Sequence, residues 1–261
     1  MNDTSLISLD KVTYVFPGGE AVFQDYTWQV ERGETWAVLG PSGCGKTTLL
    51  YLLAGLYRPD AGRVIFGGQE LERPRPRTGL IIQEYGLLPW ATVRDNARLG
   101  MRIRGFYGPD GTHAPAQAAD TGPVEPWLAR LDILDQADKY PAQLSGGQRQ
   151  RTAIARTLVL EPDTLLMDEP FSSLDAPTRE SLQDLTLELQ EERDLTLILV
   201  THNIEEAAYL GRKILMLNQP PNREPEVIAN PDAGQPAYRG SGRYQEMCSR
   251  LRVMMGQEAE R

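Results

Sequence analysis

The chain has 261 residues, 41% of them hydrophobic, so it is long enough to bury one large core with or without a subdomain. Its 27 basic and 36 acidic side chains leave a net charge of −9, which argues against a protein that grips nucleic acid along its length. The two cysteines, Cys44 and Cys248, are too few for a disulfide framework and favour a reducing cytosol.

The N-terminal part of the chain is rich in residues that favour β-strands. Residues 6–16 and 22–30 predict two strands joined by a Pro-Gly-Gly turn. Phe16 and Tyr14 lie just before that turn, and packing on a sheet explains each of them as well as a ligand contact does. Residues 1–10 lack the pattern of a signal peptide, and no apolar run approaches the roughly 18 residues of a membrane-spanning helix. We therefore expect the chain to reach a membrane only by docking to a protein that spans it.

A glycine-rich loop between a predicted strand and a predicted helix is the strongest local signal. Its residues are Gly40, Pro41, Ser42, Gly43, Cys44, Gly45, Lys46 and Thr47, with Thr48 following. Residues 36–39 predict the buried strand and residues 48–54 the helix, which is the setting that a G-x-x-x-x-G-K-[ST] phosphate loop requires. The glycines let backbone N–H groups converge on a phosphate, and the helix N-terminus adds its positive dipole end. Lys46 is placed to reach the β- and γ-phosphates and Thr47 to ligate Mg²⁺, whereas an ordinary turn before a helix is the alternative.

The segment after this loop contains a predicted strand whose last residue is polar. Residues 57–72 predict a turn and a short hairpin. Residues 79–83 predict a buried strand that ends at Gln83. Open α/β sheets place their ligands at the carboxyl ends of parallel strands, so Gln83 is a candidate ligand contact.

Residues 84–143 change character and predict a small helical subdomain inserted into the sheet domain. A helix is expected from Thr92, whose hydroxyl can cap it, to about Gly100. A second helix is expected over residues 127–134.

The segment between these helices, residues 105–126, is rich in Gly, Pro, Ala and Asp. Gly105 and the glycines and prolines after it are expected to break any regular element, which predicts a flexible surface loop. His113 has no companion ligand in this loop, so we expect it only to be solvated.

A second anion-binding signal opens the helix predicted over residues 148–160. The run is Leu144, Ser145, Gly146, Gly147 and Gln148. A serine followed by two glycines at a helix N-terminus offers free N–H groups to an anion. A simple capped helix start is the alternative.

Two later strands end in side chains that suit phosphate chemistry. The strand predicted over residues 164–167 runs into Asp168 and Glu169. In a chain with a phosphate loop, Asp168 can hold Mg²⁺ and Glu169 can act as the general base for an attacking water, although two acidic residues in a turn are the alternative. The strand over residues 195–200 leads to His202, which either contacts the γ-phosphate or is a satisfied core histidine. The remaining pattern predicts helices over residues 176–193, 203–210 and 241–257 and a strand over residues 213–217, with loops between.

These motifs occur in one order that resembles the ATP-binding cassette (ABC) ATPases over about residues 5–217. The run from Leu144 to Gln148 is nearly diagnostic of that family, and Gln83, Asp175 and His202 stand at positions that fit it. Residues 83–90, 175–180 and 201–207 are similar to the importer branch for nitrate, sulfonate, taurine and related small anions.

The resemblance implies an α/β fold, a P-loop NTPase (RecA-like) core sheet with an N-terminal antiparallel β subdomain and an inserted α-helical subdomain. It implies an ABC ATPase domain over residues 1–217, with the helical subdomain at about residues 84–160, and a short C-terminal extension over residues 218–261. No large regulatory β-domain is expected in so short an extension.

The same resemblance implies residue roles. Gly40 to Thr48 resembles the loop that binds ATP, Glu169 the catalytic base and His202 the switch residue, with Lys46 as a third catalytic group. The implied metal ligands are Thr47, Gln83 and Asp168, and Phe16 is the expected adenine-stacking residue with Tyr14 second. The four residues Ser145, Gly146, Gly147 and Gln148 are expected to close over the γ-phosphate of ATP held by the other subunit.

The implied function is the ATP-binding and ATP-hydrolysing subunit of an ABC importer for a small anionic solute, with ATP and Mg²⁺ as cofactors. Its expected partners are a second ATPase subunit in a head-to-tail dimer, transmembrane permease subunits and an extracytoplasmic solute-binding protein, but no nucleic acid. Leu87, Leu88 and Trp90 are candidate permease contacts, and packing in the core of the helical subdomain explains them equally well. The expected location is peripheral, on the cytoplasmic side of the cell membrane. The alternatives are a non-transport ABC ATPase that acts on nucleic acid or the ribosome, and a regulatory nucleotide-binding module without turnover.

Overall fold

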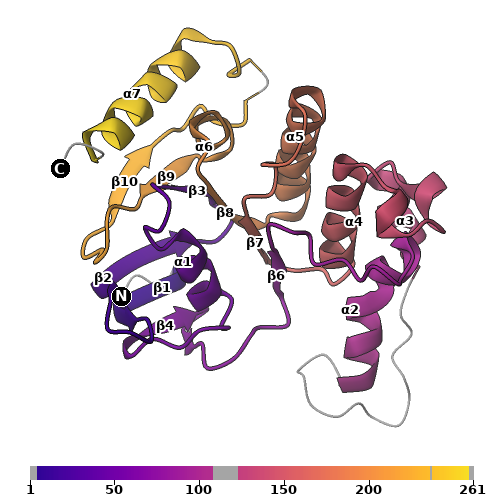
Figure 1. The fold of residues 1–261 in the computed structure, drawn as a ribbon, viewed down its shortest axis with the longest axis horizontal. Coiled ribbons are helices and arrows are strands. Elements are labelled where there is room, and N and C mark those ends of the chain that lie inside the picture. Colours follow the sequence, from indigo (N-terminus) through magenta and orange to yellow (C-terminus); the bar gives the residue numbers. More distant parts are fainter. Residues whose placement is uncertain (1–4, 108–122, 236, 259–261) are drawn as a thin grey trace.

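The computed structural model describes residues 5–107, 123–235 and 237–258, and it has the predicted α/β architecture with two sheets and flanking helices (Figure 1). One sheet is four-stranded and antiparallel, in the order β2-β1-β4-β5. Its strands are β1 (Ser5–Val15), β2 (Ala21–Glu31), β4 (Ala61–Phe66) and β5 (Gln69–Glu70). This sheet is the predicted N-terminal β subdomain.

The other sheet has six strands in the order β10-β9-β3-β8-β7-β6. They are β3 (Thr35–Leu39), β6 (Thr78–Ile81), β7 (Thr164–Asp168), β8 (Thr196–Thr201), β9 (Lys213–Met216) and β10 (Glu226–Ala229). All pairs are parallel except β9 with β10. The central strands β3, β7 and β8 are buried along their whole length, as expected for parallel strands that are covered on both faces.

Two hydrophobic cores lie on the two faces of this six-stranded sheet. One core joins the sheet to the antiparallel sheet and to α1 (Lys46–Leu53), whose four leucines are all fully buried. The other core joins it to α4 (Gly146–Leu158), α5 (Ala176–Arg193) and α6 (Ile204–Leu210). The helix that follows the phosphate loop is therefore held between two sheets, which fixes its N-terminus.

The helical insertion contains α2 (Val93–Tyr107), α3 (Glu125–Arg130) and the start of α4, and it lies beside the sheet domain in Figure 1. Short 3₁₀ turns at Leu134–Gln136 and Pro141–Gln143 connect α3 to α4.

The prediction that Gly105 breaks the first helix is wrong, because α2 continues to Tyr107. The last turn is held by tertiary contacts: the Arg104 guanidinium donates hydrogen bonds to the carbonyl oxygens of Leu160 and Pro76. These bonds offset the low helix propensity of glycine. His113 and most of the predicted loop lie outside the described residues.

The predicted bounds of the next helix, residues 127–134, are also wrong. The helix begins earlier, at Glu125, and stops at Arg130. Asp132 follows with a left-handed backbone (φ 54°), which an α-helix cannot contain.

Beyond residue 217 the chain adds a strand that the pattern did not predict. β10 pairs antiparallel with β9, so the central sheet continues past the expected domain boundary. The last helix, α7 (Gly242–Glu258), packs on α6 through buried side chains that include Leu251 and Cys248. Among the described residues, no helix combines the length and the apolar character needed to cross a bilayer.

Candidate functional site

The phosphate loop joins β3 to α1, and two of its glycines are required by close contacts. A Cβ on Gly40 would lie 2.4 Å from the carbonyl oxygen of Leu217. Gly45 has a left-handed backbone (φ 104°), and a Cβ there would lie 2.4 Å from Val22 Cγ1. Only glycine fits both positions, so the loop is packed tightly against its neighbours.

Lys46 is buried and lies across its own loop. Its Nζ donates hydrogen bonds to the carbonyl oxygens of Gly40 (2.7 Å) and Pro41 (2.8 Å). An ammonium binds phosphate oxygens more strongly than neutral carbonyls, so this side chain is held ready for an anionic ligand. Burial raises the pKa of the neighbouring Cys44 thiol, although Lys46 opposes the shift.

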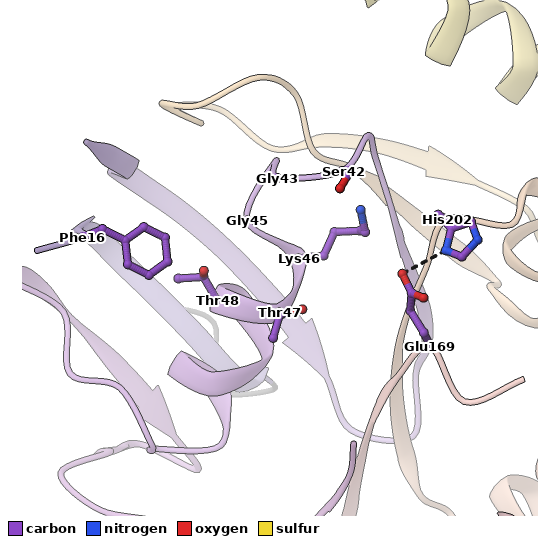
Figure 2. Close-up of a pocket in the computed structure, with 9 residues that line it drawn as sticks. All are labelled: Phe16, Ser42, Gly43, Gly45, Lys46, Thr47, Thr48, Glu169 and His202. Atoms are coloured by element: carbon purple, nitrogen blue, oxygen red, sulfur yellow. Dashed lines mark hydrogen bonds and ion pairs between the residues drawn. The ribbon is translucent and has the colours of Figure 1, made fainter. Parts of the chain in front are cut away.

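The loop forms one wall of a cleft of about 550 Å³ (Figure 2). The described residues that line it are Phe16, Ser42, Gly43, Gly45, Lys46, Thr47, Thr48, Glu169 and His202. Phe16 stands at one end of this cleft and Glu169 with His202 at the other, with the phosphate loop between them. Residues predicted for nucleotide binding and catalysis are thus brought together from the ends of β1, β7 and β8 and from the phosphate loop.

Glu169 is held from two sides at the end of β7. Its Oε2 accepts a hydrogen bond from Gln83 Nε2 (3.2 Å), and its Oε1 lies 2.9 Å from His202 Nδ1. A carboxylate only accepts, so this contact places the proton on Nδ1 of His202. The backbone of Glu169 is left-handed (φ 46°), and its N–H donates to the carbonyl of Val200 (2.9 Å). Strained backbone of this kind persists where the surroundings hold it, and it is concentrated at functional sites.

Asp168, one residue earlier, faces a different environment. The side chain is buried, and burial raises the pKa of its carboxyl group, with a further contribution from Glu169. A hydrogen bond from Thr47 and the charge of Lys46 oppose the shift. A buried carboxylate beside a hydroxyl is the hard oxygen pair that Mg²⁺ prefers, so these two residues fit the metal. Gln83 is engaged with Glu169 through its amide nitrogen, and its role as a ligand stays a prediction.

Two aromatic side chains compete for the role of adenine platform. Phe16 lines the cleft and is 40% exposed. Tyr14 meets Phe16 edge-on at 5.4 Å between ring centroids, and it stacks on Tyr57 at 5.4 Å with only 4° between the planes. One face of Tyr14 is therefore already covered, so Phe16 offers the freer face.

Ser145, Gly146, Gly147 and Gln148 form the start of α4 and are not among the residues that line this cleft. The backbone N–H of Gln148 donates to Ser145 Oγ (3.2 Å), and that of Ser145 donates to Gln148 Oε1 (2.9 Å), which makes a capping box. In Figure 1 α4 stands away from α1, so a single chain does not bring the two predicted anion sites together.

Sequence reasoning missed Asn222, which donates a hydrogen bond from Nδ2 to the carbonyl of Cys44 in the phosphate loop (2.9 Å). The residue lies in a proline-rich loop between β9 and β10, where no local pattern marks it. Only the approach of two segments 178 residues apart reveals the contact.

Comparison with known proteins gives consistent matches. The sequence profile of the family described as ABC transporter matches residues 23–172. The taurine import ATP-binding protein TauB of Pseudomonas aeruginosa is 43% identical over 203 residues, which cover 78% of this chain and 74% of the relative. The aliphatic sulfonates import ATP-binding protein SsuB of Bacillus cereus is 37% identical over 246 residues, 92% of each chain. An ATP-binding cassette solved as a dimer in a post-hydrolysis state with ADP and Pi has a TM-score of 0.72 and 27% identity, covering 85% of this chain and 98% of that one.

Proposed function

Because this chain belongs to the ABC transporter family, we propose that it is the subunit that binds and hydrolyses ATP to drive solute import. The relatives reported above are named as import ATP-binding proteins, which supports import as the direction. They lend no support to the alternative of an ABC ATPase that acts on nucleic acid or the ribosome.

The arrangement of Glu169 carries the proposal. Its carboxylate stands at the edge of the phosphate-loop cleft, with both oxygens held by Gln83 and His202. A general base must be fixed within reach of the water that it activates, and a carboxylate with two partners has little freedom to turn away. A module that only binds nucleotide has no need of such a carboxylate.

Each residue of the site has its own role in ATP binding or hydrolysis. The amides of the phosphate loop and Lys46 bind the β- and γ-phosphates, and Phe16 stacks on the adenine. Glu169 orients the attacking water and accepts its proton, while His202 positions Glu169 and contacts the γ-phosphate. Thr47 and Asp168 are the residues that hold Mg²⁺, which supplies charge neutralisation at the phosphates when bound.

The transported solute and the partners are inferred from the relatives. Taurine and aliphatic sulfonates, named for the relatives, are small organic sulfonates, and we assign this class to the importer that contains this chain. The complex further needs a second ATPase subunit, transmembrane permease subunits and an extracytoplasmic solute-binding protein, with this chain on the cytoplasmic side of the membrane. Trp90 is 74% exposed and is the candidate permease contact, whereas Leu87 packs against the core.

Replacing the proposed base tests this function. Glu169→Gln keeps the size of the side chain but replaces one accepting oxygen with an amide nitrogen that cannot take up the proton. We therefore expect ATP hydrolysis to fall by about 10² or more while ATP still binds. Glu205→Gln is the matched control, because this glutamate lies three residues after His202 and points to Arg252 instead. Equal hydrolysis rates for wild type and Glu169→Gln contradict the assignment.

A further inference from the structure

Asn222 connects three segments behind the phosphate loop. It lies in the loop between β9 and β10 and is only 5% exposed. Its Nδ2 donates to the carbonyl oxygens of Cys44 (2.9 Å) and Val22 (3.2 Å), and its Oδ1 accepts from the backbone N–H of Asn218 (2.8 Å). Both hydrogens of the amide nitrogen and one lone pair of the oxygen are thus satisfied by backbone groups.

The backbone of Asn222 strengthens the same connection. Its N–H donates to the carbonyl of Val22 (2.9 Å), and its carbonyl accepts from the N–H of Gln24 (2.9 Å). Earlier in the same segment, the backbone N–H of Leu217 donates to the carbonyl of Leu39 (2.8 Å), and its own carbonyl oxygen lies 2.4 Å from where a Cβ of Gly40 would be. Residues 217–222 therefore support the phosphate loop from its first glycine to Cys44.

These contacts set the position of Gly45 in the phosphate loop. Gly45 directly follows Cys44, and its Cα lies so close to Val22 that a Cβ has no room. Asn222 holds the carbonyls of both Cys44 and Val22, so one side chain fixes the spacing on which the left-handed backbone of Gly45 depends. The amides that follow, at Gly45 and Lys46, are those that a phosphate meets.

We propose that Asn222 is a positioning residue for ATP: it holds the phosphate loop in the form that binds the β- and γ-phosphates. It touches no part of the nucleotide and acts only through Cys44 and Val22. This inference rests on the proposed function, since it assumes that the loop binds ATP.

The test uses two variants and a matched pair of controls in the full chain. Asn222→Ala removes the amide, and Asn222→Asp keeps its shape but replaces the donor with an acceptor that faces two carbonyls. Asn230 is the control, because it is also buried and its amide makes the same kind of contacts, donating to the carbonyls of Ala208 (2.7 Å) and Gly211 (2.9 Å) and accepting from the Tyr238 hydroxyl (2.7 Å). These contacts involve no residue of the phosphate loop.

We expect both Asn222 variants to raise the KM and the dissociation constant for MgATP about tenfold, with kcat at saturating ATP changed by less than about threefold. Asn230→Ala and Asn230→Asp should lower the thermal midpoint to a similar extent but leave the KM for ATP unchanged. The proposal fails if the Asn222 variants bind ATP as the wild type does, or if the Asn230 variants weaken binding equally. If the wild-type chain itself binds no ATP, the proposed function fails instead.

A measurement on the wild type applies even if the Asn222 variants do not fold. Addition of MgATP should slow amide hydrogen exchange in residues 218–224 together with the phosphate loop, because the two segments are hydrogen-bonded to each other. If exchange slows in the loop alone, the coupling does not exist and the proposal is wrong.

Discussion

The two adjacent carboxylates at the end of β7 lie in different surroundings. Asp168 is buried, with Thr47 and Lys46 acting against the raised pKa of its carboxyl group, whereas Glu169 faces the cleft between Gln83 and His202. The left-handed backbone at Glu169 ends the strand at this point, so the second side chain does not follow the strand's alternation. Neighbouring residues in the sequence can in this way serve metal binding and base catalysis separately.

The charged Asp168 side chain should lower the stability of the fold, although the proposed function needs it. Because burial raises the pKa of this carboxyl group, its charged form destabilises the nucleotide-free fold at pH values above that pKa. Asp168→Asn should therefore raise the thermal midpoint at pH 7 by about 3 °C, the change that about 1 kcal/mol produces in a chain of this size, and it should abolish hydrolysis.

The pH dependence of this effect has a defined sign. A raised pKa for an acid means that the wild type gains stability as the pH falls through the folded-state pKa, whereas Asp168→Asn has no carboxyl group to protonate at this position. The difference in thermal midpoint between the two proteins should therefore narrow from pH 7 to pH 4. Thermal unfolding of both proteins from pH 7 to pH 4 measures this difference. A difference that widens on acidification contradicts a raised pKa for Asp168.

Removal of the Phe16 ring should weaken the binding of ligands that carry an adenine base. Phe16→Ala removes the free aromatic face at the end of the cleft, so the KM for ATP should rise about tenfold, the loss expected from one base–aromatic stack. Phe16→Tyr keeps the face and should bind as the wild type does. Inorganic triphosphate, which has no base, should bind wild type and Phe16→Ala equally, and a comparable loss for both ligands would show that the ring only supports the fold.

At the residue scale, the sequence was informative where spacing within a motif carries the chemistry. Lys46, Asp168 and Glu169 could be named as candidates because each stands at a fixed distance from a glycine or at a strand end. The contact of Tyr14 with Tyr57 and that of Asn222 with Cys44 could not be found, because each joins residues that only the fold brings together.

At the element scale, the bounds of a helix could be predicted when residues at both of its ends favour a helix terminus. The prediction for α5 is confirmed from Ala176 to Arg193, since Asp175 caps its start through Thr178 N–H (3.1 Å) and Asp194 ends it with a left-handed backbone (φ 50°). The end of α2 and the strand β10 depend on contacts with distant segments, namely Arg104 with Leu160 and β9 with β10. Propensity within a window of sequence contains no information on such contacts.

An ion pair between a buried glutamate and a partly exposed arginine joins the starts of α5 and α6. Glu206 is 3% exposed and accepts a hydrogen bond from the Thr201 hydroxyl (2.7 Å), and Arg179 Nε lies 3.7 Å from its carboxylate. Arg179 also donates to the carbonyl of Leu174 (2.7 Å), in the loop before α5. The segment that carries His202 is thereby tied to the segment that carries Asp175.

Arg179→Ala should destabilise the chain by about 3 kcal/mol at pH 8, because it leaves the Glu206 carboxylate buried without a cation. Burial already raises the pKa of Glu206, so the loss should be smaller at pH 5, where the carboxyl group can take up a proton. Adding Glu206→Gln should restore most of the stability.

Urea unfolding of the single and double variants measures this coupling. The control is Arg243→Ala, which breaks an exposed pair with Asp232 and should cost less than about 1 kcal/mol. If the double variant is as unstable as Arg179→Ala alone, the ion pair is not the source of the loss.

At the scale of the whole molecule, the two segments predicted to bind anions do not meet within the described chain. The phosphate loop leads into α1, which packs in the core between the two sheets, and the capped start of α4 belongs to the helical insertion on the other side of the central strands (Figure 1). A structural neighbour reported above is a dimer, and a head-to-tail dimer can place the α4 start of each copy over the phosphate loop of the other.

A complementation experiment decides whether the site is shared in this way. Lys46→Ala removes the phosphate contact of one copy, and Ser145→Arg blocks the α4 start, so each variant alone should hydrolyse no ATP. In a mixed head-to-tail dimer, one site combines the intact Lys46 of one copy with the intact Ser145 of the other. Mixing the two inactive variants should therefore restore roughly a quarter of the wild-type rate, since half of the randomly formed dimers contain one intact site.

The control is the double variant Lys46→Ala with Ser145→Arg, mixed with the wild type. Each mixed dimer then has both sites damaged, and only wild-type pairs remain active. If each site were built within one chain, the two single variants would stay inactive on mixing, because neither copy has a complete site. Recovery in the first mixture without recovery from mixed dimers in the second is the pattern that only a site shared between two copies produces.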